Sequence, residues 1–253
     1  MIFGFFYLES KEYDDYRLFR QLKREIGGNE LNKAKTTYEK LKNSPLVERH
    51  AIYQFLEYVR ICLDEELKGE AAIAELYEAL HEPRESFEPE KILKRRLTYN
   101  EVYILSEISS EYFDMGDYDE AINITQALID SRENSRTSED DRAKLLPVLM
   151  FNLSNYLGKA GRIKESLEVC EQAVKLCREY SEYRCMPQLL HNMATGFRLI
   201  GEKENIYRPI LMRAYHTACA FWEFDVVKLI EKEAEEKFGI LDYKVFFGID
   251  SSK

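Results

Sequence analysis

The most restrictive feature of this chain is an internal repeat near its middle. Four identities recur 40 residues apart: Pro147 with Pro187, Leu149 with Leu189, Asn152 with Asn192, and Gly161 with Gly201. A further unit lies 45 residues earlier, where Gly116 corresponds to Gly161. Repeats of this length are typical of solenoids, in which each unit buries its apolar face against its neighbours.

The repeated unit has the pattern of two helices separated by a glycine. Apolar residues recur at helical spacing on both sides of the glycines, and 11 glycines and 6 prolines in 253 residues supply few of the turns that sheets need. The same periodicity predicts helices over 13–42, with a break at 27–29, and over 70–81. Another helix is expected to begin at the N-cap Ser44 and Pro45 and to run to about Asp64.

We therefore predict an all-α fold, a right-handed superhelical solenoid of about five helix pairs with a C-terminal capping helix. A single repeat domain is expected over 1–253, with degenerate helix pairs over 1–97, the clearest repeats over 98–219, and a cap and tail over 220–253. The apolar segment 2–8 is expected to cap the first helices, or else to form a dimer contact or a joint to another domain. The tail 243–249 is expected to cap the last repeat or to lie back in the groove.

Net charge and cysteine content limit the classes of partner, the compartment and the metal sites that can be expected. The formal net charge of −10 opposes direct binding of nucleic acid, and no apolar run has the length of a membrane span. The chain starts without a secretory signal, and five cysteines without a C-x-x-C pair suit a reducing compartment, so a cytoplasmic location is expected. Cys170, Cys177, Cys185 and His191 are candidates for zinc ligation, but their spacing favours buried thiols and no metal.

Catalytic motifs are missing from the sequence. The four histidines form no i, i+4 metal pair, and there is no G-x-S-x-G, P-loop or dinucleotide fingerprint. The acidic run Glu231, Glu233, Glu235 and Glu236 is interpreted as a solvated helix face. We expect neither enzymatic activity nor a cofactor.

The unit that begins at Val102 resembles a tetratricopeptide repeat. The resemblance rests on the first-helix residues Leu105, Ile108, Ser109 and Tyr112, on the turn Gly116-Asp117-Tyr118, and on Ala121 in the second helix. Three further phrases, at 97–101, 151–154 and 189–194, are similar to the sensor region of Rgg- and PlcR-like regulators, which belong to the RRNPP family of peptide-responsive regulators of Gram-positive bacteria.

This resemblance implies a function. Family members join an N-terminal helix-turn-helix domain to a repeat domain that binds a short imported peptide and dimerises. No basic helix-turn-helix precedes the repeats in this chain, so we expect no DNA-binding domain and no direct nucleic-acid contact here. The resemblance implies a peptide-binding sensor domain of a transcriptional regulator, as a homodimer. The alternative is a constitutive adaptor that holds a protein partner without switching.

Candidate ligand-binding residues are those that point away from the helix-pair core. With Val102, Pro147 and Pro187 as first positions, the core takes positions four, seven, eight and eleven. The residues turned toward the concave surface are Tyr103, Glu107, Asn152, Asn155, Lys159, Gln188, Asn192 and Arg198.

Two chemistries are predicted for these candidates. Asn152 and Asn192 share the sixth position, and an asparagine amide both donates to and accepts from a peptide backbone. Arg198 and Lys159 could pair with a peptide carboxylate. The alternatives are that the asparagines bond a neighbouring helix or face water, and that the two cations are solvated.

Overall fold

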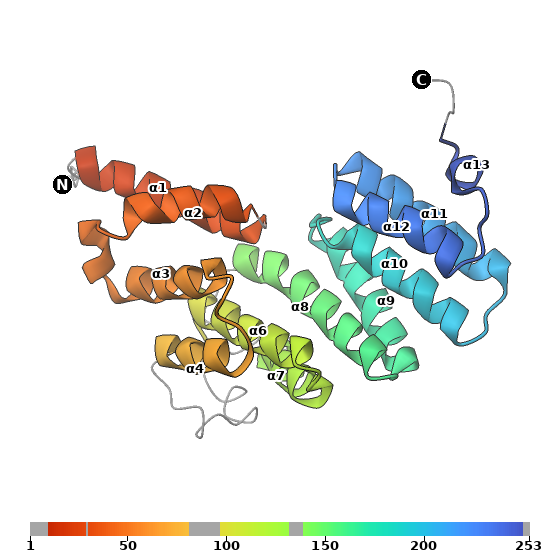
Figure 1. The fold of residues 1–253 in the computed structure, drawn as a ribbon, viewed down its shortest axis with the longest axis horizontal. Coiled ribbons are helices and arrows are strands. Elements are labelled where there is room, and N and C mark those ends of the chain that lie inside the picture. The colour runs from red at the N-terminus through yellow and green to blue at the C-terminus, as the bar shows by residue number, and fades with distance from the viewer. Residues whose placement is uncertain (1–9, 29, 81–96, 132–138, 250–253) are drawn as a thin grey trace, which may run out of the picture. The chain divides into compact units, whose positions relative to one another are not determined.

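The structure, a computed structural model, describes residues 10–28, 30–80, 97–131 and 139–249 (Figure 1). Within these ranges the regular structure is entirely helical, which confirms the predicted all-α class. The helices are α1 (Ser10–Gly27), α2 (Leu31–Leu41), the 3₁₀ turn η1 (Pro45–Glu48), α3 (His50–Leu63), α4 (Gly69–Leu80), α6 (Tyr99–Asp114), α7 (Tyr118–Asp130), α8 (Glu139–Lys159), α9 (Ile163–Glu179), α10 (Met186–Leu199), α11 (Glu204–Ala220), α12 (Phe224–Glu236) and α13 (Tyr243–Phe247). The expected helix pairs are α1–α2, α3–α4, α6–α7, α8–α9 and α10–α11.

Contacts divide the chain into two compact units, residues 1–87 with 100–111, and residues 88–99 with 112–253. The single repeat domain over 1–253 stays a prediction. The apolar segment 2–8, expected to cap the first helices, lies outside the described residues.

The first unit is held by aromatic contacts and by polar bonds to its helix backbones. The rings of Phe19 on α1 and Phe55 on α3 meet edge to face at 5.4 Å. The side-chain amide of Asn100 donates to the carbonyl of Ala51 over 2.6 Å. This hydrogen bond ties the start of α6 to α3 and satisfies a backbone acceptor that would otherwise be costly to bury.

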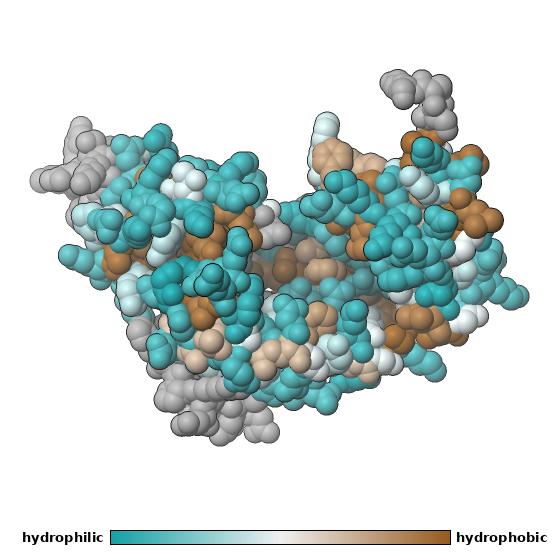
Figure 2. Space-filling view, viewed as in Figure 1, coloured by the Kyte–Doolittle hydropathy of each residue, from teal (hydrophilic) through white to brown (hydrophobic). Residues whose placement is uncertain are grey.

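The second unit has a continuous core formed by α8 to α13. Small side chains at helix crossings are fully buried, among them Ala173, Ala194 and Ala214, and larger apolar residues such as Leu189 and Leu211 fill the space between them. Each fully buried leucine contributes about 1.5–3 kcal/mol. On the face that Figure 2 shows, the described residues are mainly hydrophilic, and hydrophobic side chains reach the surface in separate places.

In the pairs α6–α7, α8–α9 and α10–α11, the two helices are joined by glycine-capped turns. Gly116, Gly161 and Gly201 have φ of +87°, +78° and +83°, a region that favours glycine. The next N–H bonds back to the helix, as in Arg162 N to Leu157 O at 2.9 Å. This is the Schellman motif, which explains why the glycines recur with the repeat.

The core register predicted from the repeat is also confirmed. Ser109, Ser154 and Ala194, all at the eighth position, are at most 1% exposed. Close packing of α9 on α10 depends on Gly196, because a Cβ at that position would lie 2.8 Å from Leu167 Cδ2.

The C-terminal tail packs on the last repeat, as one of the two predicted alternatives had it. Phe247 on α13 is 2% exposed, and its ring stacks on Tyr215 of α11 at 4.0 Å with an interplanar angle of 10°. The tail therefore caps the core of the second unit.

Candidate functional site

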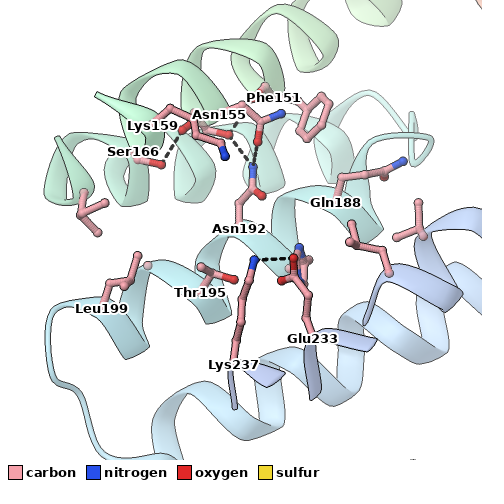
Figure 3. Close-up of a pocket in the computed structure, with 17 residues that line it drawn as sticks. Phe151, Asn155, Lys159, Ser166, Gln188, Asn192, Thr195, Leu199, Glu233 and Lys237 are labelled. Carbon is pink, nitrogen blue, oxygen red and sulfur yellow. Dashed lines mark hydrogen bonds and ion pairs between the residues drawn. The ribbon is translucent and has the colours of Figure 1, made fainter. Parts of the chain in front are cut away.

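The second unit contains a cavity of about 420 Å³ between α8, α9, α10 and α12 (Figure 3). Volumes of this size are typical of small-ligand sites. Its lining residues are Phe151, Ser154, Asn155, Gly158, Lys159, Ile163, Ser166, Gln188, His191, Asn192, Thr195, Gly196, Leu199, Val226, Leu229, Glu233 and Lys237.

Asn192 lies at the centre of the polar wall, where it joins α10 to α8. Its amide nitrogen donates to Asn155 Oδ1 over 2.7 Å and to Ser154 Oγ over 3.0 Å (Figure 3). Ser166 on α9 donates to the Ser154 carbonyl over 2.7 Å, which adds a third helix to the network. Both amide protons of Asn192 are thus used inside the protein, and its carbonyl oxygen is left as the group that can meet a ligand.

Four side-chain atoms on α10 are buried without a hydrogen-bond partner among the described residues: Gln188 Oε1, His191 Nε2, Thr195 Oγ1 and Arg198 Nε. Gln188 Oε1 and Thr195 Oγ1 are the two oxygens of this set, and both residues line the cavity. Buried polar atoms in folded proteins nearly always have a partner, and a missing partner calls for an explanation such as a bound molecule. These two oxygens therefore have bonding capacity that the described residues do not use.

A buried carboxylate, Glu233, lies on the α12 side of the cavity. Its oxygens lie 3.0 Å from His191 Nε2 and 2.5 Å from Lys237 Nζ, and Figure 3 shows Glu233 beside Lys237. Burial opposes ionisation of Glu233, but the contacts with His191 and Lys237 outweigh it and lower the pKa to about 2. The His191–Glu233 contact is close enough for an ion pair, yet its geometry is poor for a hydrogen bond, so both atoms keep bonding capacity.

The rest of the lining combines apolar groups with one more cation. Leu199 and Leu229 are 53% and 45% exposed, and Phe151 and Val226 are half-buried. Lys159 is exposed and pairs with no carboxylate among the described residues. The cavity can thus receive an apolar side chain, a backbone that donates N–H groups, and a carboxylate.

The structure places the predicted candidates in three groups. Asn155, Lys159, Gln188 and Asn192 line the cavity together, whereas Asn152 and Arg198 do not. Asn152 is half-buried on α8, and the Arg198 guanidinium lies over the Phe238 ring at 5.5 Å. Tyr103 and Glu107 lie on the part of α6 that belongs to the first unit, where the Tyr103 ring lies 5.8 Å from that of Tyr58.

Sequence reasoning did not identify the contribution of α12. The interpretation of Glu233 as part of a solvated acidic face is wrong, because the residue is 8% exposed and contacts His191 and Lys237. A signal was present: Val226, Leu229, Glu233 and Lys237 follow helical spacing along one face. His191, considered a packed or solvent-facing residue, is buried and also lines the cavity.

The cysteines are free and do not gather into a metal site. Burial raises the pKa of Cys170 and Cys177 to about 11 and that of Cys185 to about 12, so these thiols stay protonated at neutral pH. Over the described residues, no three His, Cys, Asp or Glu side chains come together as metal ligands. No helix in the described ranges has both the length and the apolar character needed to cross a membrane.

Comparison with known proteins identifies the fold. No family model matches the sequence, and no curated protein matches it either. Among solved structures, Bacillus thuringiensis PlcR in complex with the peptide PapR7 and DNA matches with a TM-score of 0.73 and 14% identity, over 88% of this chain and 76% of PlcR. The chain has the PlcR fold. The apo form of PlcR matches with a TM-score of 0.66 and 16% identity, over 90% of this chain and 79% of PlcR.

This match confirms the tetratricopeptide-like fold predicted from the repeats and the resemblance of that fold to PlcR.

Proposed function

We propose that this protein binds a short peptide in the cavity between α8, α10 and α12, and that it serves as the sensor domain of a transcriptional regulator. The observation that carries the proposal is the pair of buried oxygens without a hydrogen-bond partner, Gln188 Oε1 and Thr195 Oγ1, on two residues that line the cavity. The fold supports it, since PlcR, which has the same fold, has been crystallised with a peptide and DNA.

The chemistry of the lining fits a peptide with a free carboxylate. Gln188, Asn192 and Thr195 offer oxygens to the backbone N–H groups of a ligand. Lys159 and Lys237 supply positive charge at the cavity within a chain of net charge −10. Exposed Leu199 and Leu229 provide apolar surface for a side chain.

Signalling requires that the peptide bind one arrangement of the protein better than another. α12 is the element suited to this, because Glu233 and Lys237 line the cavity while Ile230 and Ala234, one turn away, are fully buried in the core. A peptide that engages Lys237 competes with Glu233 for the ammonium and thereby changes how α12 is held. The homodimer implied by the family resemblance stays a prediction, to be checked by sedimentation.

The test uses Thr195→Val in the full chain. Removing an unpartnered hydroxyl should leave the free protein as stable as before or slightly more stable. Affinity for peptides should fall about tenfold, the worth of one hydrogen bond made on binding. The probes are synthetic peptides of about five to eight residues with free or amidated C-termini, and binding is detected as thermal stabilisation and by calorimetry.

Thr125→Val is the matched control. Thr125 is fully buried on α7, outside the cavity, and donates to the Ala121 carbonyl over 2.8 Å. Its loss should destabilise the protein and leave peptide affinity unchanged. If no peptide binds, or if Thr195→Val binds every peptide as the wild type does, the cavity is not the peptide site. A constitutive adaptor would instead bind a partner without altered hydrogen exchange in α12.

A further inference from the structure

A second groove, of about 560 Å³, lies between α9, α10 and α11. Buried Met186 and Leu190 form its floor, and the side chains of Met212 and Phe221, 36% and 46% exposed, form its walls. At about 100° per residue, the α10 residues of this groove lie on the opposite side of the helix from those of the peptide cavity. The two sites are therefore separate.

Two arginines at this groove pair with no carboxylate among the described residues. Arg178 on α9 and Arg213 on α11 are exposed and line the groove, and neither guanidinium bonds or pairs with any residue that the structure describes. Nearby arginines behave differently: Arg208 lies 3.0 Å from Glu204, and Arg184 lies 2.9 Å from Glu182. Unpaired cations beside an apolar groove in an acidic chain indicate a ligand that combines apolar groups with carboxylates.

The sole tryptophan adjoins this groove. Trp222 follows Phe221 directly, is 76% exposed, and has a φ of +62°. In the turns after α8 and α10 the equivalent positions are Gly161 and Gly201, which adopt such a φ without strain. A large apolar residue held in solvent at a strained position is a candidate for function rather than for packing.

We propose that this groove docks a protein segment in which one or two apolar side chains are flanked by acidic residues. The apolar side chains enter between Met186, Leu190 and Met212, where the flexible methionine adapts to their shape. The flanking carboxylates pair with Arg178 and Arg213, and Phe221 with Trp222 covers one end. Exposed aromatic, methionine and arginine side chains are the residues enriched in protein interfaces, which favours a protein segment over a lipid surface.

The test is direct binding of designed peptides to the full chain. The probes are peptides of about twelve residues with two apolar residues flanked by Asp and Glu, and matched peptides carry Asn and Gln instead. Binding is followed through the emission of Trp222, which should shift to shorter wavelength as its ring leaves water. We expect acidic peptides to bind at micromolar concentration, and binding to weaken with salt.

The decisive variant is Arg178→Glu with Arg213→Glu, which should weaken binding at least tenfold. The control is Lys175→Glu with Lys228→Glu, which changes the net charge equally through exposed lysines outside the groove. It should change affinity less than about twofold. If the glutamate pair does not fold, as judged by circular dichroism, Arg178→Gln with Arg213→Gln replaces it, with the same expected loss.

Four results would overturn the proposal. They are equal binding of the neutral peptides, unchanged affinity in the arginine variants, the absence of any binding peptide, and arginine-dependent binding to phosphatidylglycerol vesicles without peptide binding. Because Thr195→Val affects only the cavity on the other side of α10, it should leave this binding unchanged. The proposal for the groove can therefore be refuted while the proposal for the peptide cavity is supported, and the reverse also holds.

Discussion

The Glu233→Gln substitution measures how much the charge of this buried carboxylate on α12 contributes to the free energy of unfolding. The carboxylate is 8% exposed, and its contacts with His191 and Lys237 lower its pKa from 4.5 to about 2. At about 1.4 kcal/mol per pKa unit, this shift corresponds to roughly 3 kcal/mol of stability. The Lys237 side chain is 46% exposed, so water screens that contact and we expect a loss of about 2 kcal/mol at pH 7.

The expected pH dependence follows from the direction of the shift. A carboxyl group whose folded pKa is lowered stabilises the protein fully above its unfolded pKa, and this contribution is lost as the pH falls through the folded value. The difference in stability between wild type and Glu233→Gln should therefore still be present at pH 5, above the unfolded pKa of Glu233. It should fall to about 1 kcal/mol at pH 3 and nearly vanish at pH 2.

Urea unfolding at pH 7, 5 and 3, followed by circular dichroism, supplies these differences. Glu235→Gln is the control, because Glu235 is exposed on the same helix, and its replacement should change stability by less than about 0.5 kcal/mol. A difference that stays constant down to pH 3 would refute the electrostatic argument. An equal effect of the control would show that the charge of α12, and not the buried contact, matters.

Three other substitutions test the packing of the second unit. Ser181→Gly should raise the unfolding free energy by about 1 kcal/mol, seen as a higher Tm, because Ser181 has a φ of +55°; an unchanged or lower Tm would contradict this. Gly196→Ala should cost about 1–3 kcal/mol in urea unfolding, since the new Cβ would lie 2.8 Å from Leu167 Cδ2. Phe247→Ala should cost about 3 kcal/mol and speed proteolysis of the tail, because the ring stacks on Tyr215; wild-type protease resistance would show that α13 is not held there.

The repeat spacing was enough to predict the helix pairs and their buried faces. Residues at one position of successive units take one environment, as the burial of Ser109, Ser154 and Ala194 shows.

The sequence was less informative where a tertiary contact competes with a local signal. Ser44 and Pro45 predicted the start of a long helix, but they open only a 3₁₀ turn, and Arg49 is extended before α3 begins. The Ser44 hydroxyl bonds both Leu46 N and Asp15, a contact 29 residues away.

The cavity shows the same limit of local reasoning. The four candidates that line it follow from helical periodicity, which turns one face of each helix away from the core. Glu233 was not predictable in this way, because its partner His191 lies 42 residues earlier in the chain and a run of acidic residues normally faces water. Helical periodicity identifies which residues share a face of a helix. Contacts with side chains of other helices decide whether a charged residue on that face is buried.

The polarity of the cavity wall adds a constraint on any peptide bound there. Sequence reasoning treated Asn192 as both donor and acceptor, but its amide protons are bonded to Asn155 and Ser154. Gln188 Oε1, Asn192 Oδ1 and Thr195 Oγ1 therefore form a row of acceptors on α10. Gln188 and Asn192 are four residues apart, about 6 Å along the helix axis, and Asn192 and Thr195 are three residues apart, about 4.5 Å. Backbone N–H groups on one edge of an extended chain recur about every 6.8 Å. An extended peptide running along α10 would meet this row with the N–H groups of alternate residues, which share that edge of the chain with the carbonyl groups of the same residues.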